Sequence, residues 1–191
     1  MSKMCKLDAD KTAVVLGCGM EGLLTVAALK TLGINKIIVI DKESEKSRAM
    51  EFGAWEFIGS HGKNGVAGVK DKIRAAAGDM ADAVFICTDS PMGRNVARRF
   101  MKNSGSICEM GFLCGWRRTP TARYFEDSMP AGGRFYAARD YENCMNFLAK
   151  AAEMKLPLYK LITHRYKLEE INEAMWTVVR EEGLGIAVFN R

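Results

Sequence analysis

The sequence of 191 residues has few of the residues that build metal centres or disulfide frameworks. It holds only two histidines, and its six cysteines stand apart, with no pair in C-x-x-C spacing. A structural zinc site needs clustered thiolates, and a catalytic zinc site needs cysteine, histidine and carboxylate side chains to converge. The sequence therefore predicts no zinc in this chain, and it favours buried free thiols in a reducing compartment.

Long hydrophobic runs are also absent. No apolar run reaches the roughly 18–20 residues that a membrane span requires. Residues 1–10 are polar and charged, without the apolar core of a secretory signal. These absences predict that the chain has no membrane partner and lies in the cytoplasm.

No strong excess of one charge sign exists, because 28 basic residues face 23 acidic ones for a net charge of +5. The densest basic group lies on one expected helix, at Arg94, Arg98, Arg99 and Lys102. A solvated helix face and a nucleic-acid surface both fit such a group. The alternation of basic with acidic residues favours the solvated face, and no basic strand with interleaved aromatics is present. We expect no nucleic-acid partner.

What the chain does have is a regular alternation of β-branched runs and helix-permissive segments. The expected strands cover residues 12–16, 36–40, 56–58, 83–87, 106–110 and 134–137. The expected helices cover residues 20–32, 43–52, 70–77, 91–102 and 140–154. Such alternation predicts an α/β fold of the Rossmann type, a doubly wound parallel sheet of six strands with helices on both faces.

The C-terminal segment departs from this alternation. Residues 161–167 are expected to be extended, 168–180 to form an amphipathic helix, and 186–189 to form a last short strand. The helix carries one apolar stripe, made of Leu168, Ile171, Ala174, Met175 and Val178. We therefore expect a nucleotide-binding domain over residues 1–161 and a C-terminal tail over residues 162–191.

The most informative motif is the glycine-rich loop Gly17-Cys18-Gly19-Met20-Glu21-Gly22. It follows a buried strand and opens a helix, which is the context that a G-x-G-x-x-G dinucleotide loop requires. In that reading Gly17 makes the tight turn, Gly19 lets the backbone approach a pyrophosphate, and Gly22 lets helix and strand pack closely. The phosphates then meet the N–H groups and the positive end of the helix dipole.

Asp41 ends the second expected strand, about 20 residues beyond the loop, where a carboxylate accepts hydrogen bonds from a ribose. The same carboxylate repels a 2′-phosphate, so NAD is favoured over NADP. Lys42 and Lys46 lie close enough in sequence to bind a phosphate, which weakens this preference. The alternative is that Asp41 only caps the following helix.

Several segments together resemble the medium-chain dehydrogenase superfamily, the zinc-containing alcohol and polyol dehydrogenases. The resemblance covers nearly the whole chain, in order. Its segments are Val14-Val15-Leu16-Gly17-Cys18-Gly19, Gly22-Leu23-Leu24, Val39-Ile40-Asp41, Glu51-Phe52-Gly53-Ala54, Asp82-Ala83-Val84-Phe85-Ile86-Cys87-Thr88, Leu161-Ile162-Thr163-His164-Arg165-Tyr166 and Leu168-Glu169-Glu170-Ile171-Asn172-Glu173-Ala174.

The resemblance implies an NAD(H) site and places no catalytic residue in this chain. Its cofactor-binding residues would be Gly17, Gly19, Met20, Glu21, Gly22, Asp41, Lys42, Lys46, Thr88, Asp89 and Gly111. In the family a GroES-like domain supplies the zinc ligands, the proton relay and most of the substrate pocket. We expect such a domain in cis or in trans, with the tail packed on it, and we expect this chain alone to be inactive. The resemblance also implies a homodimer that pairs through the sixth strand, residues 134–137.

Three residues depart from the family's pattern. Met20 and Glu21 stand where the family usually has proline and a β-branched residue, and Asp89 stands where glycine is common. Glu21 and Asp89 would place negative charge beside the cofactor. Either both carboxylates are solvated in an open site, or they weaken or abolish NAD binding.

Three functions follow. The first is the cofactor-binding domain of an NAD(P)-dependent alcohol or polyol dehydrogenase. The second is a non-catalytic nucleotide-binding or interaction module with a degenerate site. The third is an S-adenosylmethionine-dependent methyltransferase, against which the helical C-terminus argues. Both a piece of a longer enzyme and a naturally separate unit are compatible with the chain, and the resemblance implies that the substrate is selected outside it.

Overall fold

The computed structural model describes residues 7–60, 65–88, 91–109, 138–180 and 184–189. The chain divides into two compact units, Met1–Leu156 and Pro157–Arg191. The described residues contain no helix that is long and apolar enough to cross a membrane.

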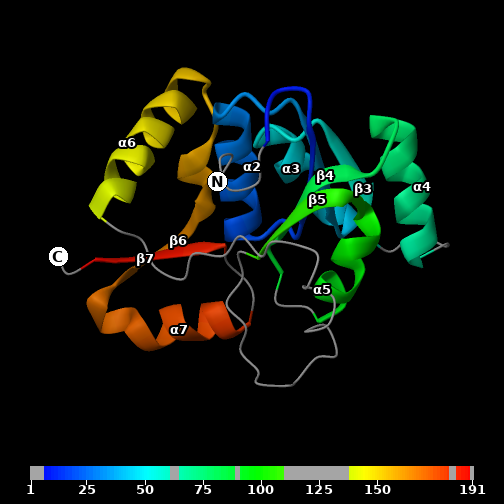
Figure 1. The fold of residues 1–191 in the computed structure, drawn as a ribbon. Helices are drawn as coiled ribbons and strands as arrows, with labels where there is room; N and C mark the ends of the chain where they lie inside the picture. The colour runs from blue at the N-terminus through cyan, green and yellow to red at the C-terminus, as the bar shows by residue number, and fades with distance from the viewer. Residues whose placement is uncertain (1–6, 61–64, 89–90, 110–137, 181–183, 190–191) are drawn as a thin grey trace. The chain divides into compact units, whose positions relative to one another are not determined.

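The first unit is built on a parallel sheet of five described strands (Figure 1). The strands are β1 (Thr12–Leu16), β2 (Lys36–Asp41), β3 (Glu56–Gly59), β4 (Ala81–Ile86) and β5 (Met101–Glu109). Their order across the sheet is β3-β2-β1-β4-β5, which confirms the doubly wound α/β fold. The expected sixth strand, residues 134–137, lies outside the described residues.

Helices follow the strands in alternation (Figure 1). They are α2 (Met20–Thr31), η1 (Glu43–Glu45), α3 (Lys46–Glu51), α4 (Gly65–Ala77), α5 (Pro91–Ala97), η2 (Arg98–Phe100) and α6 (Ala138–Glu153). Helix α2 contacts β1, β2 and α6, whereas α4 contacts β3 and η2. These are the crossover connections that a parallel sheet requires.

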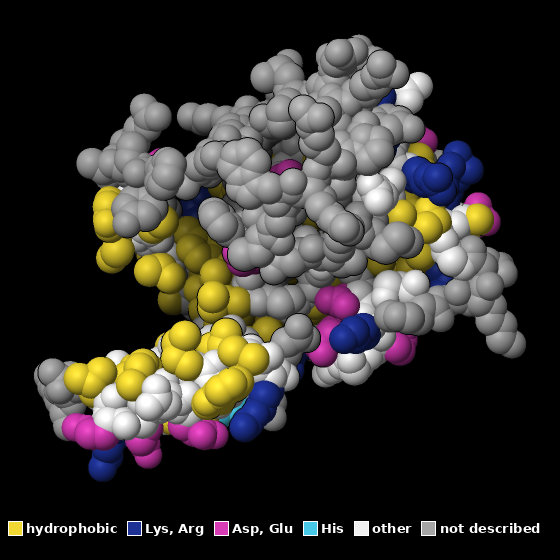
Figure 2. Space-filling model, turned by 90° about the horizontal axis from the view of Figure 1, so that it is seen from below, with side chains coloured by type: hydrophobic (Ala, Val, Ile, Leu, Met, Phe, Trp, Pro, Cys, Tyr) yellow, Lys and Arg dark blue, Asp and Glu magenta, His cyan; other side chains and the backbone are white. Residues whose placement is uncertain are grey.

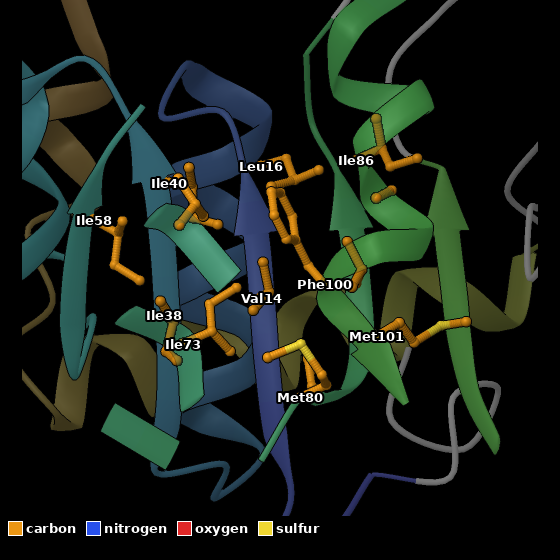
Figure 3. Close-up of a cluster of buried hydrophobic side chains, with 14 of the residues drawn as sticks. Val14, Leu16, Ile38, Ile40, Ile58, Ile73, Met80, Ile86, Phe100 and Met101 are labelled. Atoms are coloured by element: carbon orange, nitrogen blue, oxygen red, sulfur yellow. The ribbon is translucent and has the colours of Figure 1, made fainter. Parts of the chain in front are cut away.

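The core explains why the strands read as continuous apolar runs. On one face Val14 pairs in register with Ile38 and with Val84, and these side chains pack with Ile73 of α4 and Phe100 of η2 (Figure 3). Alternation along the strands turns the buried residues between them to the opposite face. A sheet buried on both faces selects β-branched residues at every position of its central strands.

Several element boundaries differ from the expectation. Helix α4 begins at Gly65 rather than at residue 70, because Val66 and Val69 already pack on the core cluster. Strand β5 begins at Met101 rather than at residue 106, and the preceding helix ends earlier than expected. Met101 is 6% exposed and pairs with Ala81, so burial draws this residue into the sheet.

The second unit confirms the expected extended segment, helix and last strand. Its elements are η4 (Leu158–Leu161), β6 (Ile162–Lys167), η5 (Leu168–Glu170), α7 (Ile171–Val179) and β7 (Gly185–Phe189). Strands β6 and β7 pair in parallel. The Lys167 N–H donates to the Glu170 carboxylate at 2.8 Å, and the Tyr166 hydroxyl lies 2.7 Å from the Thr177 hydroxyl.

The apolar stripe of the C-terminal helix is exposed for the most part. Only Ala174 of its five residues is buried, and the other buried residue of α7 is Thr177. Leu168, Ile171, Met175 and Val178 are between 40% and 59% exposed. In Figure 2 hydrophobic side chains gather on the exposed surface of this unit, at the lower left, beside acidic and basic ones. The 3.6-residue period predicted the helix correctly, but it did not tell which side is covered.

Candidate functional site

The glycine loop joins β1 to α2, and its three glycines meet three different surroundings. Gly17 has a φ of 102°, and a Cβ there would lie 2.5 Å from the carbonyl oxygen of Cys87. A Cβ on Gly22 would overlap the carbonyl group of Gly17, whereas a Cβ on Gly19 would meet nothing within 4 Å. Gly17 and Gly22 are therefore required by the protein's own packing, and only Gly19 faces open space.

Helix α2 starts at this open space. Gly19 is its N-cap, and the Gly19 carbonyl accepts the first helical hydrogen bond from the Leu23 N–H at 2.9 Å. The N–H groups of the first helical turn have no acceptor within the helix, and they sit at the positive end of its dipole. Met20 is 42% exposed and Glu21 is also exposed, so both side chains stand on the surface beside the loop.

The sheet order creates a crevice at the same edge. The chain leaves β1 to one side to form β2 and later returns to the other side to form β4. At such a switch point the connections diverge beyond the carboxyl ends of the strands, and ligands bind there. A cavity of about 480 Å³ occupies this edge, lined by Leu16, Gly17, Ile40, Asp41, Lys42, Ser60, Gly65, Val66, Val69, Thr88, Gly93, Val96 and Phe100.

Asp41 is held firmly at the polar end of this cavity. One carboxylate oxygen accepts a hydrogen bond from the Cys18 N–H at 2.6 Å, and the other accepts one from the Lys42 N–H at 2.6 Å. The N-cap of the following helical turn is Lys42, and no side chain caps it. The alternative that Asp41 caps this helix is therefore wrong, because its carboxylate accepts from the Cys18 and Lys42 N–H groups and from no N–H group within the helical turn.

The remaining expected site residues divide into three groups. Thr88 and Lys42 line the cavity, and Thr88 packs closely against Gly17. Lys46 is not among the lining residues, and its ammonium lies 4.0 Å from the Glu43 carboxylate. Asp89 and Gly111 lie outside the described residues. The structure thus brings Gly17, Asp41, Lys42 and Thr88 to one cavity and turns Lys46 to a neighbouring carboxylate on the surface.

The cavity also has residues that the sequence reasoning missed. Val66 and Val69 come from α4, Val96 from α5 and Phe100 from η2, and with Ile40 they form its apolar wall. Ser60 follows β3, and its N–H donates to the Asp41 carbonyl at 2.7 Å. The position of Ser60 directly after β3 could have identified it from the sequence, since the carboxyl ends of parallel strands meet at one edge of the sheet. The valines and Phe100 look like ordinary core residues in the sequence.

Two buried thiols flank the loop. Burial, together with the nearby Asp41 and Glu45 carboxylates, raises the pKa of Cys18 to about 12. Burial also raises the pKa of Cys87 to about 12, despite its contact with the Thr25 hydroxyl at 3.5 Å. Both thiols therefore stay protonated at neutral pH, where they are poor nucleophiles.

The expectation of buried free thiols holds for Cys18, Cys87 and Cys108, but it is wrong for Cys144. Cys144 lies on α6, whose surroundings leave this part of the helix exposed. Within the described ranges, no three His, Cys, Asp or Glu side chains come together as a possible metal site. The absence of zinc from the chain stays a prediction.

The model of the family described as zinc-binding dehydrogenase matches residues 22–150. The chain belongs to this family. The match runs from the glycine loop's last residue to Lys150 in α6, so the part of the family that the chain shares is its nucleotide-binding fold.

Individual relatives agree with this assignment. Sorbitol dehydrogenase 1 of Saccharomyces cerevisiae is 29% identical over 178 residues, which cover 91% of this chain and 49% of the yeast protein. An alcohol dehydrogenase from Thermotoga maritima has the same fold, with a TM-score of 0.82, 21% identity and coverage of 95% of this chain and 50% of its own. The chain thus spans about half the length of the relatives it matches.

A third relative carries a bound ligand. A short chain alcohol dehydrogenase of Escherichia coli CFT073, solved in complex with the cofactor NADH, matches with a TM-score of 0.73 and 18% identity. The match covers 98% of this chain and 54% of that one. At this identity the likeness shows the fold alone.

Proposed function

We propose that this chain binds NAD(H) and positions its nicotinamide for hydride transfer in an alcohol or polyol dehydrogenase. The observation that carries the proposal is the cavity at the carboxyl edge of the sheet, where the Gly17 turn and the Asp41 carboxylate meet. Membership of the zinc-binding dehydrogenase family supports it.

The residues present fit such a dinucleotide. Gly19 leaves open space at the N-terminus of α2, where a diphosphate would accept hydrogen bonds from the first-turn N–H groups. Asp41 lines the cavity and has lone pairs beyond the two hydrogen bonds it already accepts, so it can receive ribose hydroxyls. The apolar wall that includes Val69 and Phe100 would pack against the adenine ring and exclude water from it.

NAD(H), when bound, supplies the hydride acceptor or donor, and this chain's residues only bind and orient it. We propose NAD(H) rather than NADP(H) because a 2′-phosphate would meet the Asp41 carboxylate. Lys42, which lines the same cavity, is the residue that would reduce this discrimination.

The rest of the catalytic machinery would come from outside this chain. We propose that a GroES-like domain, in cis or in trans, supplies the zinc ligands and the substrate pocket, and that the chain alone is inactive. Its coverage of only about half of each relative supports this. Sorbitol dehydrogenases and a D-xylulose reductase among the relatives make a polyol the first substrate class to test.

The runner-up function is a non-catalytic nucleotide-binding or interaction module. The observation that favours it is the exposed Glu21 carboxylate in the first turn of α2, next to the proposed diphosphate position.

The site residues, the homodimer through residues 134–137 and the cytoplasmic location also stay predictions. Light scattering of the purified chain tests the dimer, which a monomeric mass would contradict.

Calorimetric titration of the chain with NADH, NADPH and S-adenosylmethionine tests the proposed function. We expect saturable binding of NADH, weaker binding of NADPH and none of S-adenosylmethionine. Absence of NADH binding at concentrations on the order of 1 mM would overturn the cofactor assignment and leave the non-catalytic module.

A further inference from the structure

The Asp41 carboxylate binds two parts of the main chain at once. Its two oxygens accept from the Cys18 N–H and the Lys42 N–H, each at 2.6 Å. Charge-assisted hydrogen bonds of this kind are roughly twice as strong as neutral ones. Cys18 is the second residue of the glycine loop, so the first of these bonds ties the loop directly to the end of β2.

A second contact ties the loop to the same strand. The Gly17 N–H donates to the Ile40 carbonyl at 3.0 Å, and the Cys18 side chain is 2% exposed, with its sulfur 4.0 Å from the Glu45 carbonyl. The protein's own contacts therefore hold the loop against the end of β2 and the helical turn that follows it. Gly19, the residue that faces open space, comes directly after the residue that Asp41 holds.

From this geometry we infer that Asp41 is a positioning residue for the glycine loop, in addition to its proposed contact with the ribose. The inference rests on the proposed function for its ligand and adds a role that the ribose contact does not contain. Asp41 holds the Cys18 N–H and thereby sets where the following N–H groups of Gly19 and α2 meet a diphosphate. One carboxylate thus serves both the adenosine side and the diphosphate side of the cofactor.

The two roles have a consequence for changing the cofactor preference. Removing Asp41 takes away the group that repels a 2′-phosphate, but it also releases the loop that binds the diphosphate. We therefore expect Asp41→Ala to weaken the binding of NADH and to bring no gain in affinity for NADPH. Asp41→Asn removes the same charge and keeps one acceptor oxygen, which can serve one of the two N–H groups.

The first experiment measures the hydrogen bond between the Cys18 N–H and the Asp41 carboxylate without any ligand. Amide hydrogen exchange of Cys18, followed by NMR in the full chain, should be at least about tenfold faster in Asp41→Ala than in the unmodified protein. Asp41→Asn should lie between the two. Asp71→Ala removes the same charge from an exposed position on α4 and should leave Cys18 exchange unchanged. Core amides such as those of Val14 and Val39 report whether each variant is folded.

The second experiment uses inorganic pyrophosphate, which has no ribose. Asp41→Ala and Asp41→Asn have equal charge, so a purely ribose-binding Asp41 predicts that they bind pyrophosphate equally. The positioning role predicts tighter binding by Asp41→Asn. Equal affinities, or unchanged exchange of Cys18 in Asp41→Ala with a protected core, would overturn the inference. Failure of the unmodified chain to bind NADH overturns the proposed function instead, because the exchange measurement needs no cofactor.

Discussion

At the scale of the residue, the three glycines of the loop are glycine for different reasons, two because of packing and one because of the proposed ligand. A side chain at Gly22 would overlap the Gly17 carbonyl, and one at Gly17 would approach the Cys87 carbonyl at 2.5 Å. A side chain at Gly19 would meet nothing within 4 Å. Two of the three glycines are thus explained by the fold itself, and only the middle one depends on a ligand for its explanation.

Substitution of the two last glycines by alanine tests this division. Gly19→Ala should leave the thermal midpoint nearly unchanged and weaken NADH, because the added methyl group occupies the space that a diphosphate needs. Gly22→Ala should destabilise the fold by several kcal/mol or prevent folding, since backbone must move to relieve the overlap. Circular dichroism melts and calorimetric titration measure the two effects. A Gly22→Ala protein as stable as the unmodified one would contradict the packing described above.

The raised pKa values of the buried thiols predict how the free energy of unfolding depends on pH. The pKa of Cys18 and that of Cys87 are raised from the ordinary value of 9.0 to about 12. In the unfolded chain these thiols ionise near pH 9, while in the folded chain they keep their protons. The unfolded state therefore binds fewer protons above pH 9, and the free energy of unfolding should fall as pH rises from 9 towards 12.

Urea unfolding across this pH range measures the effect, and Cys87→Ala should reduce the slope. Iodoacetamide labelling offers an independent check at about pH 8, where the reactive species is the thiolate. Among the described cysteines, Cys144 should be labelled in the folded chain, and Cys18 and Cys87 only after unfolding. Rapid labelling of Cys18 in the folded chain would contradict its burial.

At the scale of the element, one carboxylate joins three strands at the opposite edge of the sheet. Asp82 in β4 accepts from the Thr12 N–H of β1 at 2.9 Å and from the Lys102 ammonium of β5 at 3.0 Å. Burial alone would raise the pKa of Asp82, but these two hydrogen bonds and the nearby Lys11 outweigh it, so the pKa lies below the ordinary 3.8. The charged form is therefore the one that the fold stabilises.

Asp82→Asn should lower the free energy of unfolding at pH 7 by about 1 kcal/mol, because the ion pairs are lost while one acceptor oxygen remains. The contribution of the Asp82 charge is fully present above pH 3.8 and disappears as pH falls through the lowered pKa of the folded state. The difference in the free energy of unfolding between the unmodified protein and Asp82→Asn should therefore become smaller in acid. Urea unfolding at neutral and acidic pH measures it, and a difference that grows in acid would be inconsistent with a stabilising charge.

In helix α7 the periodicity of the sequence predicted an apolar stripe but not which of its residues are buried. The stripe predicted from the sequence is real, yet Ile171 and Met175 are 40% and 59% exposed while Ala174 is 3% exposed. Replacing both exposed residues by glutamine should leave the thermal midpoint unchanged and reduce self-association in light scattering. Ala174→Gln is the matched control, which should destabilise the unit by forcing a polar side chain into a buried position. Equal melting behaviour of the two variants would contradict the orientation of α7.

At the scale of the whole molecule, the proposed site belongs to one unit. Among the residues that the structure describes, all those that line the cavity lie within Met1–Leu156. A chain that ends at Leu156 should therefore bind NADH as tightly as the full chain, provided circular dichroism shows that it is folded. Loss of NADH binding in a folded truncated chain would show that the second unit contributes to the site.

The sequence by itself determined the architecture, the glycine loop and the place of Asp41 at the end of the second strand. β-Branched runs buried on both faces predict parallel strands, and the G-x-G-x-x-G spacing with a carboxylate at the end of the second strand predicts the loop and Asp41. These features are local, because each depends on residues close together in the chain. The same locality allowed the tail's strand and helix to be predicted from their periods.

Only the tertiary structure decided what each local feature faces. It directed Asp41 to the Cys18 N–H rather than into the helical turn that follows β2, and it left Met175 exposed. It also gathered Val69 and Phe100 from separate helices into the wall of one cavity. Such contacts join residues far apart in sequence, and a hydrophobic residue in a helix looks the same whether it lines a cavity or fills the core.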